Sequence, residues 1–261
     1  MIRLLSVVYG KLRRTLFSTQ AGSVLFKLMH PRKERFTCPI CSYHGPFCDD
    51  APLTGRTYNT HCPKCGSNVR MRLQWLAIES LRKRFDFSKL TVHHFSPEKA
   101  MSRRFRSIFG KYFSAGLSLA PVDCPADLTD LPFANESCDF IFASHVLEHI
   151  KDDAKAISEI ARVLKPGGIA VLPVPIGQER TVEYAEANPK ENGHVRAPGV
   201  DYFDRYRKAF ARVEVVASKD FPAEYQLWDY DDRTRFPTQD CPLKHPMAGD
   251  RHPDYVPICF R

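Results

Sequence analysis

Residues 138–176 constrain the fold more than any other stretch, because they combine two apolar strands with an amphipathic helix between them. The first strand is expected over residues 138–144, CDFIFAS, and the second over residues 168–176, GIAVLPVPI. Between them, residues 152–164 repeat apolar side chains at helical spacing and begin with acids, which the helix dipole favours. Two strands joined through a helix lie parallel in one sheet, so this stretch predicts an α/β fold.

The same alternation of strands and helices continues over most of the chain. Further strands are expected over residues 89–95, 111–117, 212–218 and 254–260, and helices over residues 68–85, 97–109 and 200–210. This pattern predicts a doubly wound, mostly parallel sheet covered by helices, for which a main domain over residues 69–261 has sufficient length. The Pro- and Asp-rich stretch 219–253 is expected to be a long loop.

Two CxxC pairs separated by 20 residues carry the strongest local signal in the chain. The spacing is typical of paired zinc-binding turns, and four thiolates would saturate a tetrahedral Zn²⁺ ion and leave no open position for catalysis. We therefore predict a small structural zinc ribbon over residues 36–68, with the ligands Cys38, Cys41, Cys62 and Cys65. Nearby alternative ligands are His44, His61 and Cys48, and free cysteines in a loop-rich segment are the competing interpretation.

The remaining cysteines and the hydropathy of the chain bear on its compartment. Five further cysteines are scattered and the total of nine is odd, which fits a reducing compartment, most simply the cytoplasm. No run of 18 or more apolar residues is present, so the sequence predicts no transmembrane helix.

Positive charge is concentrated at the front of the chain. Residues 1–90 hold 16 Lys and Arg against 5 Asp and Glu, whereas the remaining residues hold 22 against 25, so the front is expected to meet an anionic partner or to be a solvated basic surface. The basic amino-terminal segment, residues 1–35, has an amphipathic helical pattern in Leu4, Val8, Leu12 and Leu16. It could contact an anionic membrane surface through residues 1–30; a transit peptide and a packed terminal helix are the alternatives.

Three polar residues follow the strand at residues 138–144, namely His145, Glu148 and His149. In doubly wound sheets, ligands bind beyond the carboxyl ends of the strands, at the point where strand order reverses. His145, at the strand tip, is the candidate general base or substrate contact, because histidine suits proton transfer near neutral pH. Glu148 and His149 could equally tie the following turn to a neighbouring helix.

Residues 127–176, with the series LPF, SCDFI, VLEH and RVLKPGG, resemble the second half of a class I S-adenosylmethionine-dependent methyltransferase of the type 11-like group. The resemblance extends less sharply from about Lys89 to the end. The chain also resembles a subgroup of this superfamily in two further features. They are an amino-terminal ribbon with two CxxC pairs and the strand end HFSPE at residues 94–98. The resemblance implies a Rossmann-like sheet of seven strands, the last one antiparallel and supplied by VPICF.

The resemblance also implies a role for each of several residues at the site. The loop after the first strand, formed by Phe95, Ser96, Pro97 and Glu98, would wrap the methionine part of S-adenosylmethionine. Asp127 and Leu128 would contact the adenine, and Ser144 and His145 would line the site beside the sulfonium. Candidate substrate contacts in the segment after the fifth strand are His194, Arg196 and Asp201, with Arg196 suited to a carboxylate or phosphate; an ordinary polar surface loop is the alternative.

Two departures from the family pattern bear on cofactor binding. The glycine-rich GxGxG loop after the first strand is replaced by HFSPEKA, and the acid that usually ends the second strand is missing near Gly116, Leu117 and Ser118. Glu98 could substitute in part for that acid.

Three functions compete at this point. The leading hypothesis is a methyltransferase for a small-molecule or glycan-type acceptor. A second is an RNA methyltransferase whose basic ribbon contacts phosphates, although aromatic residues near the ribbon are few. A third is a non-catalytic scaffold or binding protein with a methyltransferase fold, because function resides in sites and not in folds.

Overall fold

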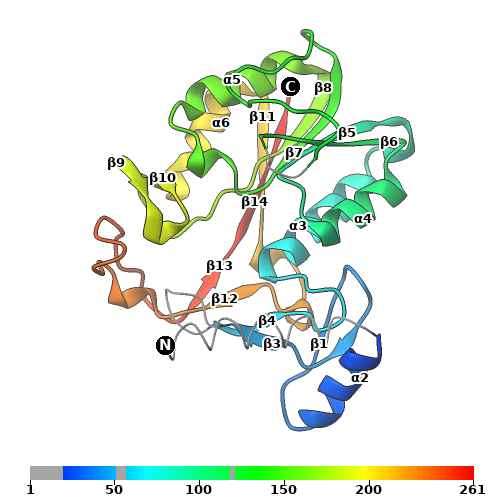
Figure 1. Cartoon of the computed structure of the whole chain (residues 1–261), viewed down its shortest axis with the longest axis vertical. Helices are drawn as coiled ribbons and strands as arrows, with labels where there is room; N and C mark the ends of the chain where they lie inside the picture. Colours follow the sequence, from blue (N-terminus) through cyan, green and yellow to red (C-terminus); the bar gives the residue numbers. More distant parts are fainter. Residues whose placement is uncertain (1–19, 51–56, 118–120) are drawn as a thin grey trace. The chain divides into compact units, whose positions relative to one another are not determined.

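A computed structural model of the chain describes residues 20–50, 57–117 and 121–261 (Figure 1). The predicted amphipathic helix with Leu4, Val8, Leu12 and Leu16 lies outside these residues. The structure divides into two compact units. The first contains the described residues up to Glu79 together with two returning segments, Ala217–Arg233 and Gly249–Asp254. The second consists of Ser80–Val216, Thr234–Ala248 and Tyr255–Arg261.

The second unit is built on a mixed sheet with the order β11-β14-β8-β7-β5-β6. The bounds of these strands, in chain order, are β5 (Thr91–Phe95), β6 (Lys111–Ala115), β7 (Cys138–Ala143), β8 (Leu164–Val171), β11 (Arg212–Ala217) and β14 (Tyr255–Phe260). Parallel pairing joins β5 to β6 and β7, and β7 to β8. β14 pairs antiparallel with β8, as predicted for VPICF. The predicted Rossmann-like α/β sheet is therefore present.

The sheet has six strands within the described residues, so the expectation of seven strands is wrong for this part of the chain. A further strand beside β6 is reduced to one parallel bridge, between Ala115 and Cys124. The two prolines that flank this point, Pro121 and Pro125, have no backbone N–H and cannot extend a ladder of hydrogen bonds.

Helices cover both faces of this sheet, with α5 (Asp153–Val163) beside α6 (Phe203–Ala209) on one side and α4 (Lys99–Ile108) on the other (Figure 1). α5 begins at the cap Asp152, whose side chain accepts a hydrogen bond from the Lys155 N–H. Ile157 and Ile160 of α5 and Tyr206 of α6 are buried in one apolar cluster with the sheet. A hairpin that the sequence did not predict, β9 (Val182–Asn188) and β10 (His194–Ala197), precedes α6.

The first unit consists of short elements around the cysteine pairs. They are α2 (Gln20–Met29), β1 (Phe36–Thr37), β2 (His44–Gly45), β3 (Cys48–Asp50), β4 (Thr57–His61), β12 (Trp228–Tyr230) and β13 (Arg251–Pro253). The helix α3 (Val69–Arg82) contains the boundary between the units. The predicted loop 219–253 thus contains two strands, which form an antiparallel pair. No helix among the described residues combines the length and apolar character needed to cross a membrane.

Candidate functional site

The central strands of the second unit end at the same level. Phe95 of β5 is paired with Ala115 of β6 on one side and with Ala143 of β7 on the other. The chain first adds β6 on one side of β5 and then crosses to add β7 on the other, so the strand order reverses between β5 and β7. Ligands of doubly wound sheets bind at this point. The loop from Ser96 and the loop from Ser144 therefore start from neighbouring strand ends.

Each of the three strands is followed by a residue with left-handed backbone. These residues are Ser96 (φ 50°), Gly116 (φ 128°) and His145 (φ 54°). Ser96 donates its N–H to Ala115 O at 3.1 Å, and His145 donates its N–H to Pro173 O at 2.9 Å. Left-handed backbone in a residue with a side chain costs on the order of 1–3 kcal/mol and clusters at functional sites. The turns at Ser96 and His145 are thus held in an unfavourable conformation by the surrounding structure, whereas glycine adopts this conformation at 116 without that cost.

Glu98, predicted to contact the cofactor, is held from the strand before it. Its carboxylate lies 3.2 Å from Nε2 of His94, and Nδ1 of His94 lies 3.2 Å from the Tyr112 hydroxyl. Tyr112 in turn donates to Ser102 Oγ at 3.0 Å. Burial lowers the pKa of His94 although Glu98 opposes the effect, which favours the neutral imidazole. The Glu98 side chain is therefore oriented by one contact from β5, with His94, which is itself held by Tyr112 of β6.

The other predicted cofactor contacts differ in exposure. Phe95 and Ser144 are buried, whereas Ser96 is exposed and Pro97 is half-buried. Asp127 accepts hydrogen bonds from the Thr129 N–H and hydroxyl through Oδ1, at 2.8 and 2.9 Å. Leu128 is buried in the apolar cluster of the second unit, so only its backbone would reach a ligand.

An acid that the sequence analysis missed lies beside the end of β6. Asp123 accepts hydrogen bonds from the Ser114 N–H at 2.8 Å and from the Ser114 hydroxyl at 2.7 Å through Oδ2. These bonds hold the pKa of Asp123 below its usual value. The acid expected at the strand end itself is absent, but the loop that follows brings one back to the same strand. Asp123 lies beside β6 only because the loop folds back onto this strand, and the sequence alone does not show that the loop does so.

The three polar residues after β7 lie around a buried carboxylate. Glu148 is 0% exposed, and its Oε1 lies 3.3 Å from Nδ1 of His145 and 4.0 Å from Nε2 of His194. Burial favours a neutral carboxyl, yet the contact with His145 outweighs burial and lowers the pKa of Glu148. The ring of His149 lies edge-to-face on that of His194, with centroids 4.8 Å apart. His194, predicted as a substrate contact, therefore joins the group that follows β7.

Arg196, also predicted as a substrate contact, is bound inside the protein. Its Nη1 donates to Leu147 O at 2.7 Å and to Ile150 O at 2.6 Å, and its Nη2 donates to Lys151 O at 2.9 Å. Its Nε donates to the carboxylate of Glu183 at 3.0 Å. In this structure the guanidinium fastens β10 to the 3₁₀ turn η2 (Leu147–His149), which carries Glu148 and His149.

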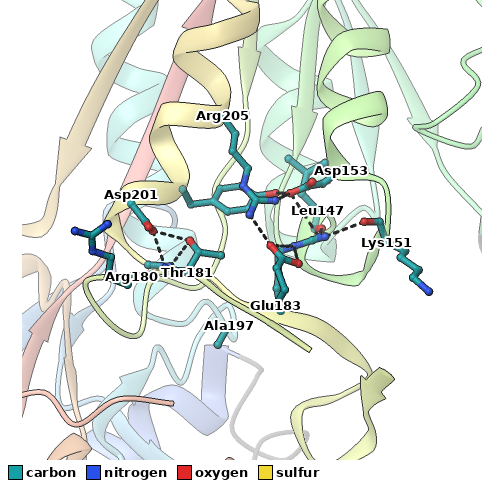
Figure 2. A network of polar contacts seen from close by, with 12 residues as sticks. Leu147, Lys151, Asp153, Arg180, Thr181, Glu183, Ala197, Asp201 and Arg205 are labelled. Atoms are coloured by element: carbon teal, nitrogen blue, oxygen red, sulfur yellow. Dashed lines mark hydrogen bonds and ion pairs between the residues drawn. The ribbon is translucent and has the colours of Figure 1, made fainter. Parts of the chain in front are cut away.

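The network around this guanidinium extends through Glu183 to Arg205, and Figure 2 also shows a separate contact between Asp201 and Thr181. Arg205 donates to Asp153 at 2.6 Å and to Glu183 at 2.5 Å. Asp201, the third predicted substrate contact, accepts from both the N–H and the hydroxyl of Thr181 at 2.7 Å and so orders the start of the hairpin.

The four predicted zinc ligands come together in the first unit. Sγ of Cys38 lies 3.7 Å from Sγ of Cys65, and Sγ of Cys41 lies 3.6 Å from Sγ of Cys62. A tetrahedron with Zn–S bonds of about 2.3 Å has edges of about 3.8 Å. These two sulfur–sulfur distances are close to that edge length, and all four sulfur atoms lie within 4.8 Å of one another.

The two CxxC turns have the same backbone. Ser42 N donates to Cys38 O at 2.8 Å, and Gly66 N donates to Cys62 O at 2.9 Å. Both donors are left-handed, with φ of 57° and 75°. The residue after each pair therefore closes a turn that points both thiols of that pair toward the same point.

A buried arginine accompanies the cysteine quartet. Arg72 is 0% exposed and donates to the carbonyls of Ser67, Thr60 and Gln226 at 2.6–3.1 Å. Burial lowers the pKa of Arg72 to about 10, which leaves the guanidinium charged near neutral pH. Zinc bound by four thiolates carries net negative charge, which this cation would offset.

An exposed apolar face lies on α2, in the segment for which membrane contact is predicted. Its side chains are more than half exposed, as shown by Val24 (54%), Leu25 (52%), Leu28 (71%) and Met29 (59%). Contact of residues 1–30 with a membrane stays a prediction.

Comparison with known proteins identifies one matching stretch. A family model described as a methyltransferase domain matches residues 111–172, from β6 to the end of β8. An uncharacterized methyltransferase of Mycobacterium sp. (strain JLS) is 48% identical over 44 residues, which are 17% of this chain and 18% of that protein. A demethylmenaquinone methyltransferase of Clavibacter sepedonicus is 42% identical over 57 residues, 20% of this chain and 23% of that protein.

The chain thus spans about a fifth of the length of these curated relatives. Among solved structures, an S-adenosylmethionine-dependent methyltransferase from Mesorhizobium loti aligns with a TM-score of 0.48 at 16% identity, over 74% of this chain and 100% of that one. The family model alone shows that residues 111–172 are similar to a methyltransferase domain, and these residues supply the edge strand β6 and the inner strands β7 and β8 of the sheet.

Proposed function

We propose that the second unit binds S-adenosylmethionine and transfers its methyl group to a small-molecule or glycan-type acceptor. The observation that carries the proposal is the reversal of strand order between β5 and β7, next to the stretch that matches a methyltransferase domain. The cofactor would supply an electrophilic methyl group on a sulfonium. The task of the protein is then to position that group and the acceptor, because methyl transfer is an in-line displacement.

The residues at this edge of the sheet suit such a ligand. The left-handed turn at Ser96 and the rigid side chain of Glu98 would replace the missing glycine-rich loop around the methionine part. Asp127 would accept from the adenine amine through Oδ2, because Oδ1 already accepts from Thr129. Asp123, held beside the end of β6, is the acid available for the ribose hydroxyls. Ser144 and His145 would lie beside the sulfonium.

His145 is the proposed general base for an acceptor that must lose a proton. Its Nδ1 faces Glu148, and its Nε2 is buried without a hydrogen bond to the described residues. An imidazole that is oriented through one nitrogen and has no protein partner at the other is arranged to exchange a proton with a bound ligand.

We also propose that Cys38, Cys41, Cys62 and Cys65 bind a structural Zn²⁺ ion. The sulfur spacing, the paired turns and the buried Arg72 support this proposal. The saturated site would supply no open position for chemistry, so zinc would stabilise the first unit and take no part in methyl transfer.

Calorimetric titration of the zinc-loaded chain with S-adenosylmethionine and S-adenosylhomocysteine tests the cofactor proposal. We expect saturable binding of both, weakened about ten- to a hundredfold by Asp127→Ala, since a hydrogen bond to a charged group contributes about 1.5–3 kcal/mol. Asp130→Ala, which removes an exposed acid three residues away, is the matched control and should bind normally.

His145→Asn belongs in the same series, because asparagine tolerates the left-handed backbone of this position but supplies no base. It should bind both ligands within a few-fold of the parent chain. Absence of binding to either ligand by the parent chain would reject the methyltransferase proposal and favour the scaffold hypothesis.

A further inference from the structure

We infer that Glu148, His149 and His194 form a second metal centre, one that binds a divalent first-row transition-metal ion. One ligand atom from each residue can be chosen so that all three lie within 4.8 Å of one another. Two imidazoles and one carboxylate are a donor set typical of such ions, whereas Mg²⁺ and Ca²⁺ prefer oxygen ligands alone. This set shares no residue with the cysteine quartet, which lies in the first unit.

The carboxylate of Glu148 provides an independent reason for a cation at this place. The side chain is 0% exposed, and neither of its oxygens makes a hydrogen bond within the part of the chain that the structure describes. Its neighbours are the imidazoles of His145 at 3.3 Å and His194 at 4.0 Å. The contact with His145 engages Oε1 alone, and a buried carboxylate is costly unless it is fully paired or coordinates a metal. A divalent ion between Glu148 and the two histidines would satisfy it.

The backbone that carries these three residues is held in place by hydrogen bonds that do not involve the proposed ion. Glu148 and His149 are the last two residues of η2, and His194 is the first residue of β10. Arg196, two residues further along β10, bonds the carbonyls of Leu147 and Lys151 on either side of this pair. The backbone segments that carry the ligands are therefore fixed to each other, and Figure 2 shows Leu147 and Lys151 within this network.

Only side-chain adjustment is needed to form the site. Donor atoms around a tetrahedral ion with bonds of about 2.1 Å lie about 3.4 Å apart. The imidazoles of His149 and His194 turn about their side-chain bonds without moving the turn or the strand. His145 remains on the carboxylate of Glu148, in the place of the outer partners that orient metal ligands.

The solvent exposure of the three side chains increases from Glu148 to His149, so one side of the proposed ion would be open. Glu148 is buried, His194 is half-buried and His149 is exposed. Three protein ligands leave coordination positions for water or for an acceptor oxygen, as in catalytic metal sites. On the proposed methyl transfer, on which this role rests, the ion would hold an acceptor hydroxyl and lower its pKa.

Titration with Mn²⁺ of the full chain loaded with one equivalent of Zn²⁺, which the four thiolates take up, tests the site and is followed by the electron paramagnetic resonance signal of free Mn²⁺. Mn²⁺ binds least tightly of the divalent first-row ions, so it does not displace zinc from the thiolate site. We expect one saturable site, weakened at least about tenfold by Glu148→Gln, His149→Ala or His194→Ala, because even outer-shell partners contribute that much. His245→Ala, which removes an exposed histidine of the same unit, should bind as the parent chain does.

His149→Ala keeps the test decisive if the buried variants fail to fold, because His149 is exposed. The inference is overturned if the parent chain shows no saturable Mn²⁺ binding, or if the affinity is the same in His149→Ala and the parent. Titration with S-adenosylhomocysteine without Mn²⁺ separates this inference from the proposed function. If the chain binds Mn²⁺ but not S-adenosylhomocysteine, the metal site is supported and the methyltransferase proposal is rejected. If it binds S-adenosylhomocysteine but not Mn²⁺, only the metal site is rejected.

Discussion

Ser42 and Gly66 occupy the same place in the two halves of the cysteine quartet, one residue after each CxxC pair, and both have left-handed backbone. Glycine adopts this conformation without steric cost, whereas a residue with a Cβ pays roughly 1–2 kcal/mol. A Cβ at Gly66 would meet no atom within 4 Å, so replacement by alanine isolates the backbone effect.

Gly66→Ala is therefore expected to weaken zinc binding about five- to thirtyfold, which corresponds to the conformational cost of about 1–2 kcal/mol. Competition with a chromophoric chelator measures the change. Gly177→Ala is the matched control, because a Cβ there is also free of contacts and the backbone is not left-handed. Equal zinc affinity in Gly66→Ala and Gly177→Ala would show that this turn does not couple to the metal.

Single residues also show which site features a sequence can predict. The four cysteines could be predicted because two CxxC pairs are local patterns, and each turn closes on itself. Arg196 was predicted as a substrate contact because it stands in a polar segment, yet it is 2% exposed. Its burial depends on the β9–β10 hairpin and on carbonyls about 45 residues earlier in the chain, and residue type alone shows neither.

At the scale of elements, Arg196 joins β10 to η2 and the two residues after it through hydrogen bonds to three carbonyls. Without the Arg196 guanidinium, the carbonyls of Leu147, Ile150 and Lys151 and the carboxylate of Glu183 lose the hydrogen bonds that Arg196 donates to them. Arg205 shares the carboxylates of Glu183 and Asp153 but makes no hydrogen bond to η2 within the described residues, and its side chain is 31% exposed.

Arg196→Met should therefore lower the free energy of unfolding by about 3–5 kcal/mol, the usual cost of breaking a buried pair. Arg205→Met should cost clearly less, and Arg196→Lys should not restore stability because an ammonium cannot reach the carbonyls as a planar fork does. Urea unfolding followed by circular dichroism measures all three. Similar losses for Arg196→Met and Arg205→Met would contradict the assigned role of Arg196.

The elements differ in how well the sequence predicts them. Every strand of the large sheet overlaps a predicted one, because buried parallel strands are short apolar runs bounded by turns. The missing seventh strand could have been foreseen from Pro121 and Pro125, which cannot donate to a ladder. The hairpin could not, since β9 is a mostly exposed strand without an apolar alternation.

For the molecule as a whole, the first unit is discontinuous in sequence. The segments Ala217–Arg233 and Gly249–Asp254 belong to it, although the cysteines lie before residue 66. Arg72 connects them, because it donates both to Ser67 O beside the quartet and to Gln226 O in the returning segment. The sequence predicts a loop over all of residues 219–253, because strands of three residues, such as β12 and β13, carry no usable periodicity.

Removal of the proposed zinc ion is expected to loosen this whole unit. Chelation should raise amide hydrogen exchange in β12 and β13 as well as around the cysteines, while the central strands β5 and β7 of the second unit stay protected. Exchange measured by mass spectrometry with and without chelator provides the test. An increase confined to residues 36–66 would show that the returning segments do not depend on the metal.

The return of the chain to its first unit sets an order of events during synthesis. A ribosome releases the four cysteines early, but the carbonyls of Tyr225 and Gln226 that accept from Arg72 emerge only after the entire βαβ stretch of the second unit. Domains generally fold as units while the chain grows. A nascent chain shorter than about residue 226 would therefore hold a complete set of thiols beside an arginine that can reach Thr60 and Ser67 but still lacks its acceptors at Tyr225 and Gln226.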